Sequence, residues 1–151
     1  MPTVRLAALR DETGAVLAES VIVFGVVTLL TIGLVEFGSL LWQRNQVHVG
    51  VRDAARYMAR CPMSTPSFDS WCSQDIAKNI ALFGSREFGA PRVWNWTDPD
   101  NIAILPAVLT RETELVVVTG TFEYSGSPLF GALGLPAITM EYTHQQRYIG
   151  W

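Results

Sequence analysis

Charge is scarce in this sequence. Only 17% of its 151 residues are charged and the net charge is −3, whereas about a quarter of the residues in an ordinary globular domain are charged. Proteins that bind nucleic acid normally present a basic surface, so the acidic balance argues against that class of partner. The length allows about one domain of ordinary size.

The motifs of the common enzyme classes are also missing. The sequence has no glycine-rich phosphate loop and no H-E-x-x-H pair. Its two histidines, His48 and His144, stand alone, and the run DPDN at 98–101 lacks the glycine and the distal glutamate of a calcium loop. We therefore expect no enzymatic activity, no catalytic residue, no metal and no cofactor.

Cysteine is limited to Cys61 and Cys72. With no further cysteine or histidine nearby, the pair cannot complete a four-ligand zinc site. In an oxidising compartment a disulfide is the expected outcome, and closing so short a loop stabilises a fold by about 3 kcal/mol in the chain-entropy model. Two separate thiols are the alternative.

One long hydrophobic run is present, from Ala15 to Trp42, and its only charged residues are Glu19 and Glu36. As a helix at about 1.5 Å per residue it measures roughly 42 Å, and about 20 residues suffice to cross a bilayer core. A lone strand would leave backbone groups unpaired in lipid, so the span must be helical. The run exceeds the core of a signal peptide and no A-x-A site follows it. We expect a retained transmembrane segment at 15–42.

The residues before this run resemble a known processing site. The stretch GAVLAE, Gly14–Glu19, resembles the site at which prepilin peptidase cuts type IV prepilins. The resemblance implies a leader at 1–14, a cut between Gly14 and Ala15, and Glu19 as the fifth mature residue. It also implies that Glu19 pairs with the N-terminal amine of a neighbouring subunit, because a carboxylate in lipid needs a partner. A position of Glu19 at the lipid headgroups is the alternative.

A wider resemblance covers residues 12–60 well and 114–148 loosely. It is carried by EFG at 36–38, QRNQV at 43–47 and RDAARYMAR at 52–60, which resemble TadE-like proteins. These are minor pilins, or pseudopilins, of the tight-adherence (Tad, or Flp) pilus. The resemblance implies an α+β, pilin-like fold that contributes to pilus assembly and surface adhesion. The implied partners are other pilin subunits, Tad assembly proteins, prepilin peptidase and the bacterial inner membrane.

Several alternatives stay open at this stage. TadE, TadF and TadG types resemble one another in this region, so the subtype is not fixed. Val51-Arg52 precedes Asp53 where many relatives have a small-residue or Glu-Gly pattern. A pseudopilin of a type II secretion system would share the site and the architecture. An unprocessed single-pass anchor whose outer part binds an envelope protein is the rival from a different class.

Apolar residues at helical spacing predict that the helix continues beyond the membrane as an outer extension at 43–60. They are Val47, Val51, Ala54, Ala55 and Met58. Gly50 costs about 1 kcal/mol of helix propensity without stopping the helix, and Cys61-Pro62 ends it, since a residue before proline disfavours the α region. The chain's own sheet is the simplest cover for this stripe, and a neighbouring subunit is the alternative.

Residues 61–151 are predicted to form a β-rich head. A helix is expected at 74–83, with Ser73 as its N-cap, Gly84 as its stop, and Ile76, Ile80 and Phe83 on one face. Strands are expected at 92–96, 101–105, 114–124 and 137–148. The apolar connection at 125–136 either packs under the sheet as a short helical turn or contacts the membrane or another subunit; it contains Leu129, Phe130, Leu133 and Leu135.

The signals for orientation conflict. Arg5 and Arg10 precede the span, whereas Arg44, Arg52, Arg56 and Arg60 follow it, so the positive-inside rule by count places the C-terminal side in the cytoplasm. Large domains, however, translocate largely regardless of charge. The cysteine pair and the prepilin-like site both favour the outside, and we therefore expect a periplasmic head.

Overall fold

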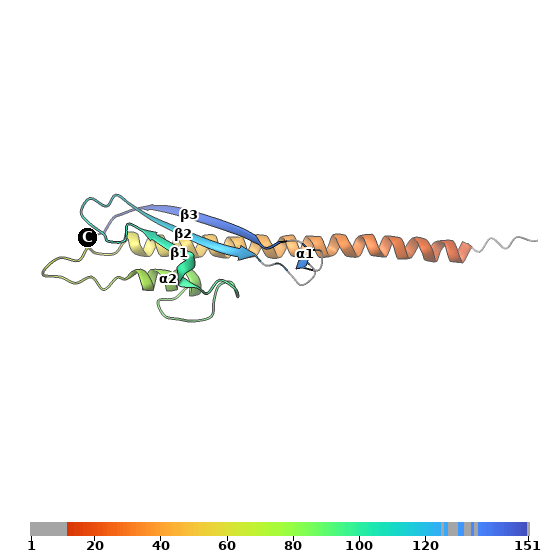
Figure 1. Cartoon of the computed structure of the whole chain (residues 1–151), viewed down its shortest axis with the longest axis horizontal. Helices are drawn as coiled ribbons and strands as arrows, with labels where there is room; N and C mark the ends of the chain where they lie inside the picture. Colours follow the sequence, from red (N-terminus) through yellow and green to blue (C-terminus); the bar gives the residue numbers. More distant parts are fainter. Residues whose placement is uncertain (1–11, 125, 127–129, 132–133, 135, 151) are drawn as a thin grey trace, which may run out of the picture. The chain divides into compact units, whose positions relative to one another are not determined.

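The computed structural model describes residues 12–124, 126, 130–131, 134 and 136–150, and Figure 1 shows its elements. They are helices α1 (Glu12–Ala59) and α2 (Gln74–Phe83), the 3-10 turn η1 (Pro99–Asn101), and strands β1 (Ile102–Leu105), β2 (Leu115–Tyr124) and β3 (Ile138–Arg147). A long apolar N-terminal helix, a short helix and a three-stranded antiparallel sheet make an α+β, pilin-like layout. The predicted fold class is confirmed.

The chain divides into two compact units, Met1–Phe37 and Gly38–Trp151, which we call the N-terminal unit and the C-terminal unit. Helix α1 contributes residues to both units. Most of the predicted leader, including Arg5 and Arg10, lies outside the described residues.

Two hydroxyl groups in the N-terminal part of helix α1 are satisfied by the helix's own backbone. In the N-terminal unit the hydroxyls of Ser20 and Thr31 each donate to the carbonyl four residues earlier, at 2.8 Å. At the far end the helix tightens, because the N–H of Cys61 donates to the carbonyl of Met58 at 3.1 Å. Pro62 follows, so α1 ends where the sequence predicts.

Helix α2 has the two predicted caps. The Oγ atom of Ser73 accepts from the N–H of Ile76 at 3.1 Å. Gly84 adopts a left-handed conformation with φ 73°, and its N–H donates to the carbonyl of Ile80 at 3.0 Å. A residue with a side chain is strained at this φ, which explains the glycine.

The residues that α2 buries most deeply lie beside the face that carries Ile76, Ile80 and Phe83. Ile76, Ile80 and Phe83 are only half-buried, and the buried residues are Ala77, Ala81 and Leu82. The reason is the close approach of α1: a Cβ atom on Gly50 would collide with the backbone oxygen of Ala81. Small residues on α2 permit this contact, so the largest side chains lie to one side of it.

The sheet has the order β1-β2-β3, with both neighbouring pairs antiparallel. Ile102 pairs with Gly120, and Tyr124 pairs with Ile138. Alternate residues of β2 are buried, as a strand with one covered face requires. They include Val116, Val118, Phe122 and Tyr124.

Residues 92–96 do not form the predicted strand. Val93 and Trp96 are fully buried, and the N–H of Trp96 donates to the carbonyl of Val93 at 3.0 Å, which closes a turn. The indole Nε1 of Trp96 donates to the backbone carbonyl of Thr121 at 3.0 Å. The buried side chains of Val93 and Trp96 therefore hold this segment against the core, and its backbone does not pair with a strand.

The core of the C-terminal unit lies between α1 and the inner face of the sheet. Val47, Val51, Ala54, Ala55 and Met58 of α1 are all buried, as predicted. A Cβ atom on Gly120 would lie 2.6 Å from the Cγ2 atom of Val51, so the glycine lets helix and strand meet closely. The chain's own sheet thus covers the helical stripe.

The connection between β2 and β3 is described in part. Phe130 packs edge-on against Tyr124, with 6.2 Å between ring centroids. Phe130 and Gly131 adopt a helical turn. Leu129, Leu133 and Leu135 lie outside the described residues.

Candidate functional site

The described part of the N-terminal unit is apolar on every side. None of residues 14–37 is buried, and Leu17, Phe24 and Leu34 are each at least two-thirds exposed. Helix α1 is long and apolar enough to cross a membrane near its N-terminus. A helix that is hydrophobic all round is covered by lipid or by other protein.

The predicted processing site lies at the start of this helix. Gly14, Ala15 and Glu19 all belong to α1 and are exposed. Glu19 lies about 6 Å along the axis from Ala15, at about 1.5 Å per residue. The cut after Gly14 and the pairing of Glu19 with an amine stay predictions.

The predicted disulfide joins Cys61 to Cys72, with 5.8 Å between their Cα atoms. Cys61 follows the end of α1 and is buried. The bond ties the end of α1 to the segment that leads into α2. No other cysteine is present in the chain.

The C-terminal segment also binds the end of α1. The N–H of Ile149 donates to the carbonyl of Ala59 at 2.9 Å, and the Tyr148 hydroxyl donates to the carbonyl of Cys61 at 2.7 Å. Burial raises the pKa of the Tyr148 phenol above its ordinary value of 10.0. These bonds satisfy carbonyls that a helix end leaves without an intrahelical partner. Sequence reasoning missed Tyr148, because no local pattern links it to residues nearly ninety positions earlier.

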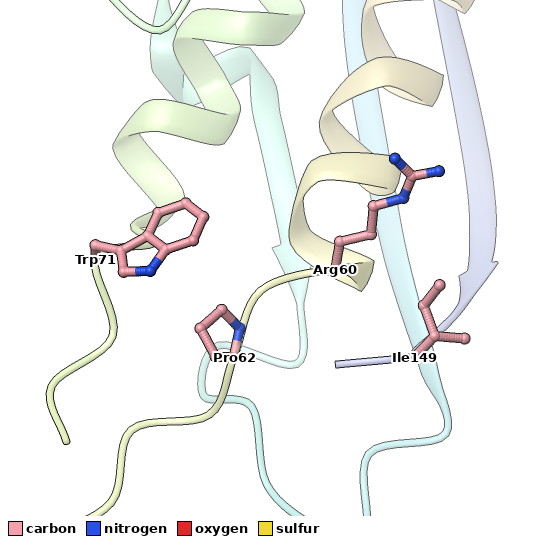
Figure 2. A pocket seen from close by; sticks show the side chains of 4 residues that line it. All are labelled: Arg60, Pro62, Trp71 and Ile149. Carbon is pink, nitrogen blue, oxygen red and sulfur yellow. The ribbon is translucent and has the colours of Figure 1, made fainter. Parts of the chain in front are cut away.

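We call the contacts of Tyr148 and Ile149 with the end of α1 the C-terminal clamp. Beside it lies an open groove of about 810 Å³, which is lined by Arg60, Pro62, Trp71 and Ile149 (Figure 2). Trp71 and Ile149 are 59% and 60% exposed. The guanidinium of Arg86 stacks over the rings of Tyr57 and Trp71, at 5.7 and 5.4 Å from their centroids. Apolar side chains and one cation can contact another protein, but these four offer no nucleophile and no general base.

The two histidines have structural surroundings. The His48 Nε2 atom is hydrogen-bonded to the Tyr142 hydroxyl, and the two rings lie 4.1 Å apart between centroids, which links α1 to β3. His144 is half-buried opposite Val118 on the inner side of the sheet. Within the described ranges, no three His, Cys, Asp or Glu residues gather as metal ligands.

A comparison with protein-family models gives a match to part of the chain. The family model described as TadE-like protein matches residues 14–56, less than a third of the chain. No curated protein and no solved structure gives a significant match. The matched segment starts at Gly14 and covers the apolar helix and the part of α1 that packs under the sheet. Residues 14–56 are thus a TadE-like sequence, which indicates a Tad pilus-associated protein.

Proposed function

We propose that the protein is a minor pilin, or pseudopilin, of a Tad (Flp) pilus in the bacterial inner membrane. The observation that carries this proposal is the start of the TadE-like match at Gly14, the glycine of the processing site. From there the match continues through an exposed apolar helix into a packed one. A soluble domain would bury such an apolar helix, whereas the exposed part of this helix needs lipid or another protein to cover it.

In this proposal prepilin peptidase removes residues 1–14. The cut frees the amine of Ala15, one helical turn before Glu19. Within lipid the Glu19 carboxylate needs a cation, and the amine of the adjacent subunit supplies it. Because desolvating both charges offsets much of their attraction, the pair chiefly fixes the register between subunits.

We place the C-terminal unit in the periplasm. The Cys61–Cys72 disulfide supports this side, because disulfides persist in oxidising compartments. Arg44, Arg52, Arg56 and Arg60 act against it by count, but a large domain is translocated largely regardless of such charges.

The role that we infer is mechanical. The groove at Arg60 and Trp71 has surfaces for protein contact and lacks catalytic groups among its lining residues. The protein would join other pilin subunits and Tad assembly proteins, help to initiate or stabilise the fibre, and so contribute to surface adhesion.

The intact mass of the membrane-extracted protein tests the proposal. With prepilin peptidase present, the chain should begin at Ala15; without the enzyme, or with Gly14→Val, it should retain residues 1–14. Gly25→Val is the matched control, because nothing lies within 4 Å of a Cβ at that position. A chain that begins at Met1 in a peptidase-positive strain would contradict processing and favour an unprocessed anchor.

A further inference from the structure

One surface of the C-terminal unit carries three arginines at the end of α1. Arg52 and Arg56 lie four residues apart on one ridge of the helix, and Arg60 follows directly after the last helical residue, Ala59. Arg56 and Arg60 are exposed and have no ion pair in the described part of the chain. The Nε atom of Arg52 is buried without a hydrogen-bond partner among the described residues. We call these three residues the basic row.

Arg56 of the basic row lies on the side of α1 that the unit leaves uncovered. Val47, Val51 and Ala54 define the side that faces the sheet, and Arg56 lies roughly opposite to it at about 100° per residue. Asp53 is the only acidic residue between positions 38 and 60. It is bound to Arg92 at 2.9 Å and so does not neutralise the row.

The outer face of the sheet carries the opposite charge. Phe122 points into the core, so Thr121 and Glu123 of β2 point outward. Thr121 pairs with Glu141 and Glu123 pairs with Thr139, which places the two glutamates diagonally on this face. Both are exposed and have no ion pair within the described residues. We call Glu123 and Glu141 the acidic pair.

Neither surface has an ion pair among the residues that the structure describes. Like charges on neighbouring strands repel each other, and the adjacent arginines of the basic row do so along the helix. The basic row and the acidic pair carry opposite charges, so the two surfaces of neighbouring copies attract each other. The structure therefore presents two complementary charged surfaces on opposite sides of one helix-and-sheet layer.

We propose that the basic row of one copy binds the acidic pair of the next copy of this chain. Arginines four residues apart are separated by about 6 Å along a helix, and diagonal residues on a sheet by about 7–8 Å, so the two charge spacings correspond. Arginine and carboxylate form short, charge-assisted hydrogen bonds. The contact is heterologous, because different surfaces of the two copies meet. A basic row therefore stays free at one end of the assembly and an acidic pair at the other, so that further copies can join head to tail.

This proposal rests on the proposed function, because it places the contact in a pilus fibre. The partner that it identifies is a second copy of this chain. The contact involves residues of the C-terminal unit only, whereas processing involves Gly14 and Ala15. The two proposals can therefore fail separately.

Photo-cross-linking of the full-length chain in its membrane tests the contact. A photoreactive phenylalanine analogue replaces Val49, which lies beside the basic row, in a tagged copy that is co-expressed with a second copy. The adduct should join two copies of this chain, and mass spectrometry should map it to residues 119–123 or 139–143. Reversing the acidic pair in the second copy, by Glu123→Arg and Glu141→Arg, should reduce the adduct about fivefold or more.

Reversing the charges on both copies together tests whether the basic row and the acidic pair contact each other directly. Arg56→Glu and Arg60→Glu in the tagged copy, combined with the reversed acidic pair in the other, should restore the adduct to within about twofold. Asp75→Arg, an exposed acidic position in the first turn of α2, is the matched control and should change nothing. Restoration also shows that the variants fold, and the neutral pair Glu123→Gln and Glu141→Gln should reduce the adduct in the same direction.

Three results would overturn the proposal: an adduct that ignores charge reversal, one that maps elsewhere on this chain, and one with a different protein. The intact mass measured on the same sample separates the two proposals. An adduct in chains that retain Met1 would reject processing and keep the contact, whereas chains that begin at Ala15 without the adduct would reject the contact alone.

Discussion

The two units of this chain use apolar residues for different purposes. In the N-terminal unit none of residues 14–37 is buried within the chain, although 16 of these 24 residues are hydrophobic. In the C-terminal unit, α1, α2 and the sheet close around a core that includes Trp96, Phe122 and Leu82, each less than 3% exposed. The same helix runs through both. The first half of α1 thus leaves its apolar side chains exposed, as a helix that is covered by lipid or by other protein does, whereas the second half packs against its own chain.

Glycine substitutions should break the comparison most clearly. Gly50→Leu should destabilise the C-terminal unit by about 3 kcal/mol or more, because a side chain there collides with the backbone of Ala81 and with Trp96. Gly33→Leu should change its stability by less than about 0.5 kcal/mol, since nothing lies within 4 Å of a Cβ at that position. Thermal unfolding of the detergent-solubilised full chain measures both. Equal losses from the two variants would contradict the division into units.

The disulfide offers a second test of the difference between the two units, because it stabilises only the C-terminal one. The double substitution Cys61→Ala and Cys72→Ala should cost the C-terminal unit roughly 2–3 kcal/mol, because the bond closes a loop of sequence separation 11. Chemical unfolding with and without reductant measures the loss. Reductant should lower the stability of the original chain and leave that of the double variant unchanged; an unaffected original chain would show that the bond does not stabilise the fold.

The smallest effect is expected at the C-terminal clamp. Tyr148→Phe removes one hydrogen bond, to the carbonyl of Cys61, and should cost about 1 kcal/mol at neutral pH. Burial raises the phenol pKa above 10.0 in the folded chain. The neutral phenol therefore contributes stability that is complete below its ordinary pKa and is lost as pH rises through the raised value.

Unfolding curves at about pH 8 and about pH 11 check this prediction, since they lie on either side of the ordinary tyrosine pKa. The original chain should lose more stability over that interval than the Tyr148→Phe chain. Tyr142→Phe is the control, because it removes a tyrosine hydroxyl that contacts His48 and not the end of α1. Tyr124→Phe is unsuitable because that side chain is buried in the core. Identical pH profiles for the original and the Tyr148→Phe chains would exclude the clamp as an alkaline-sensitive contact.

Local sequence signals were enough for much of this fold. The apolar run, Ser73 as an N-cap and Gly84 as a helix stop act through neighbouring residues, and the period of two in β2 separates its two faces. The failures involve distant contacts. Residues 92–96 have the composition of a strand, but Trp96 fills the space that Gly50 and Gly120 leave open.

The candidate site divides in the same way. The processing motif is read within six residues, Gly14–Glu19, and needs no structure to be recognised. The clamp at Tyr148 and the acidic pair exist only once β2 and β3 are in register, as in the pairing of Thr121 with Glu141. A sequence alone does not specify that register, because strand alternation leaves the partner of each residue open.

The central claim is that the exposed half of α1 is a pilin segment in which Glu19 pairs with a freed amine. The most direct measurement is the amount of mature chain in sheared surface fibres, compared between the original protein and Glu19→Ala. Both proteins should be trimmed to Ala15 in the membrane, and Glu19→Ala should be depleted from the fibres. Equal amounts of the two proteins in the fibres would contradict it.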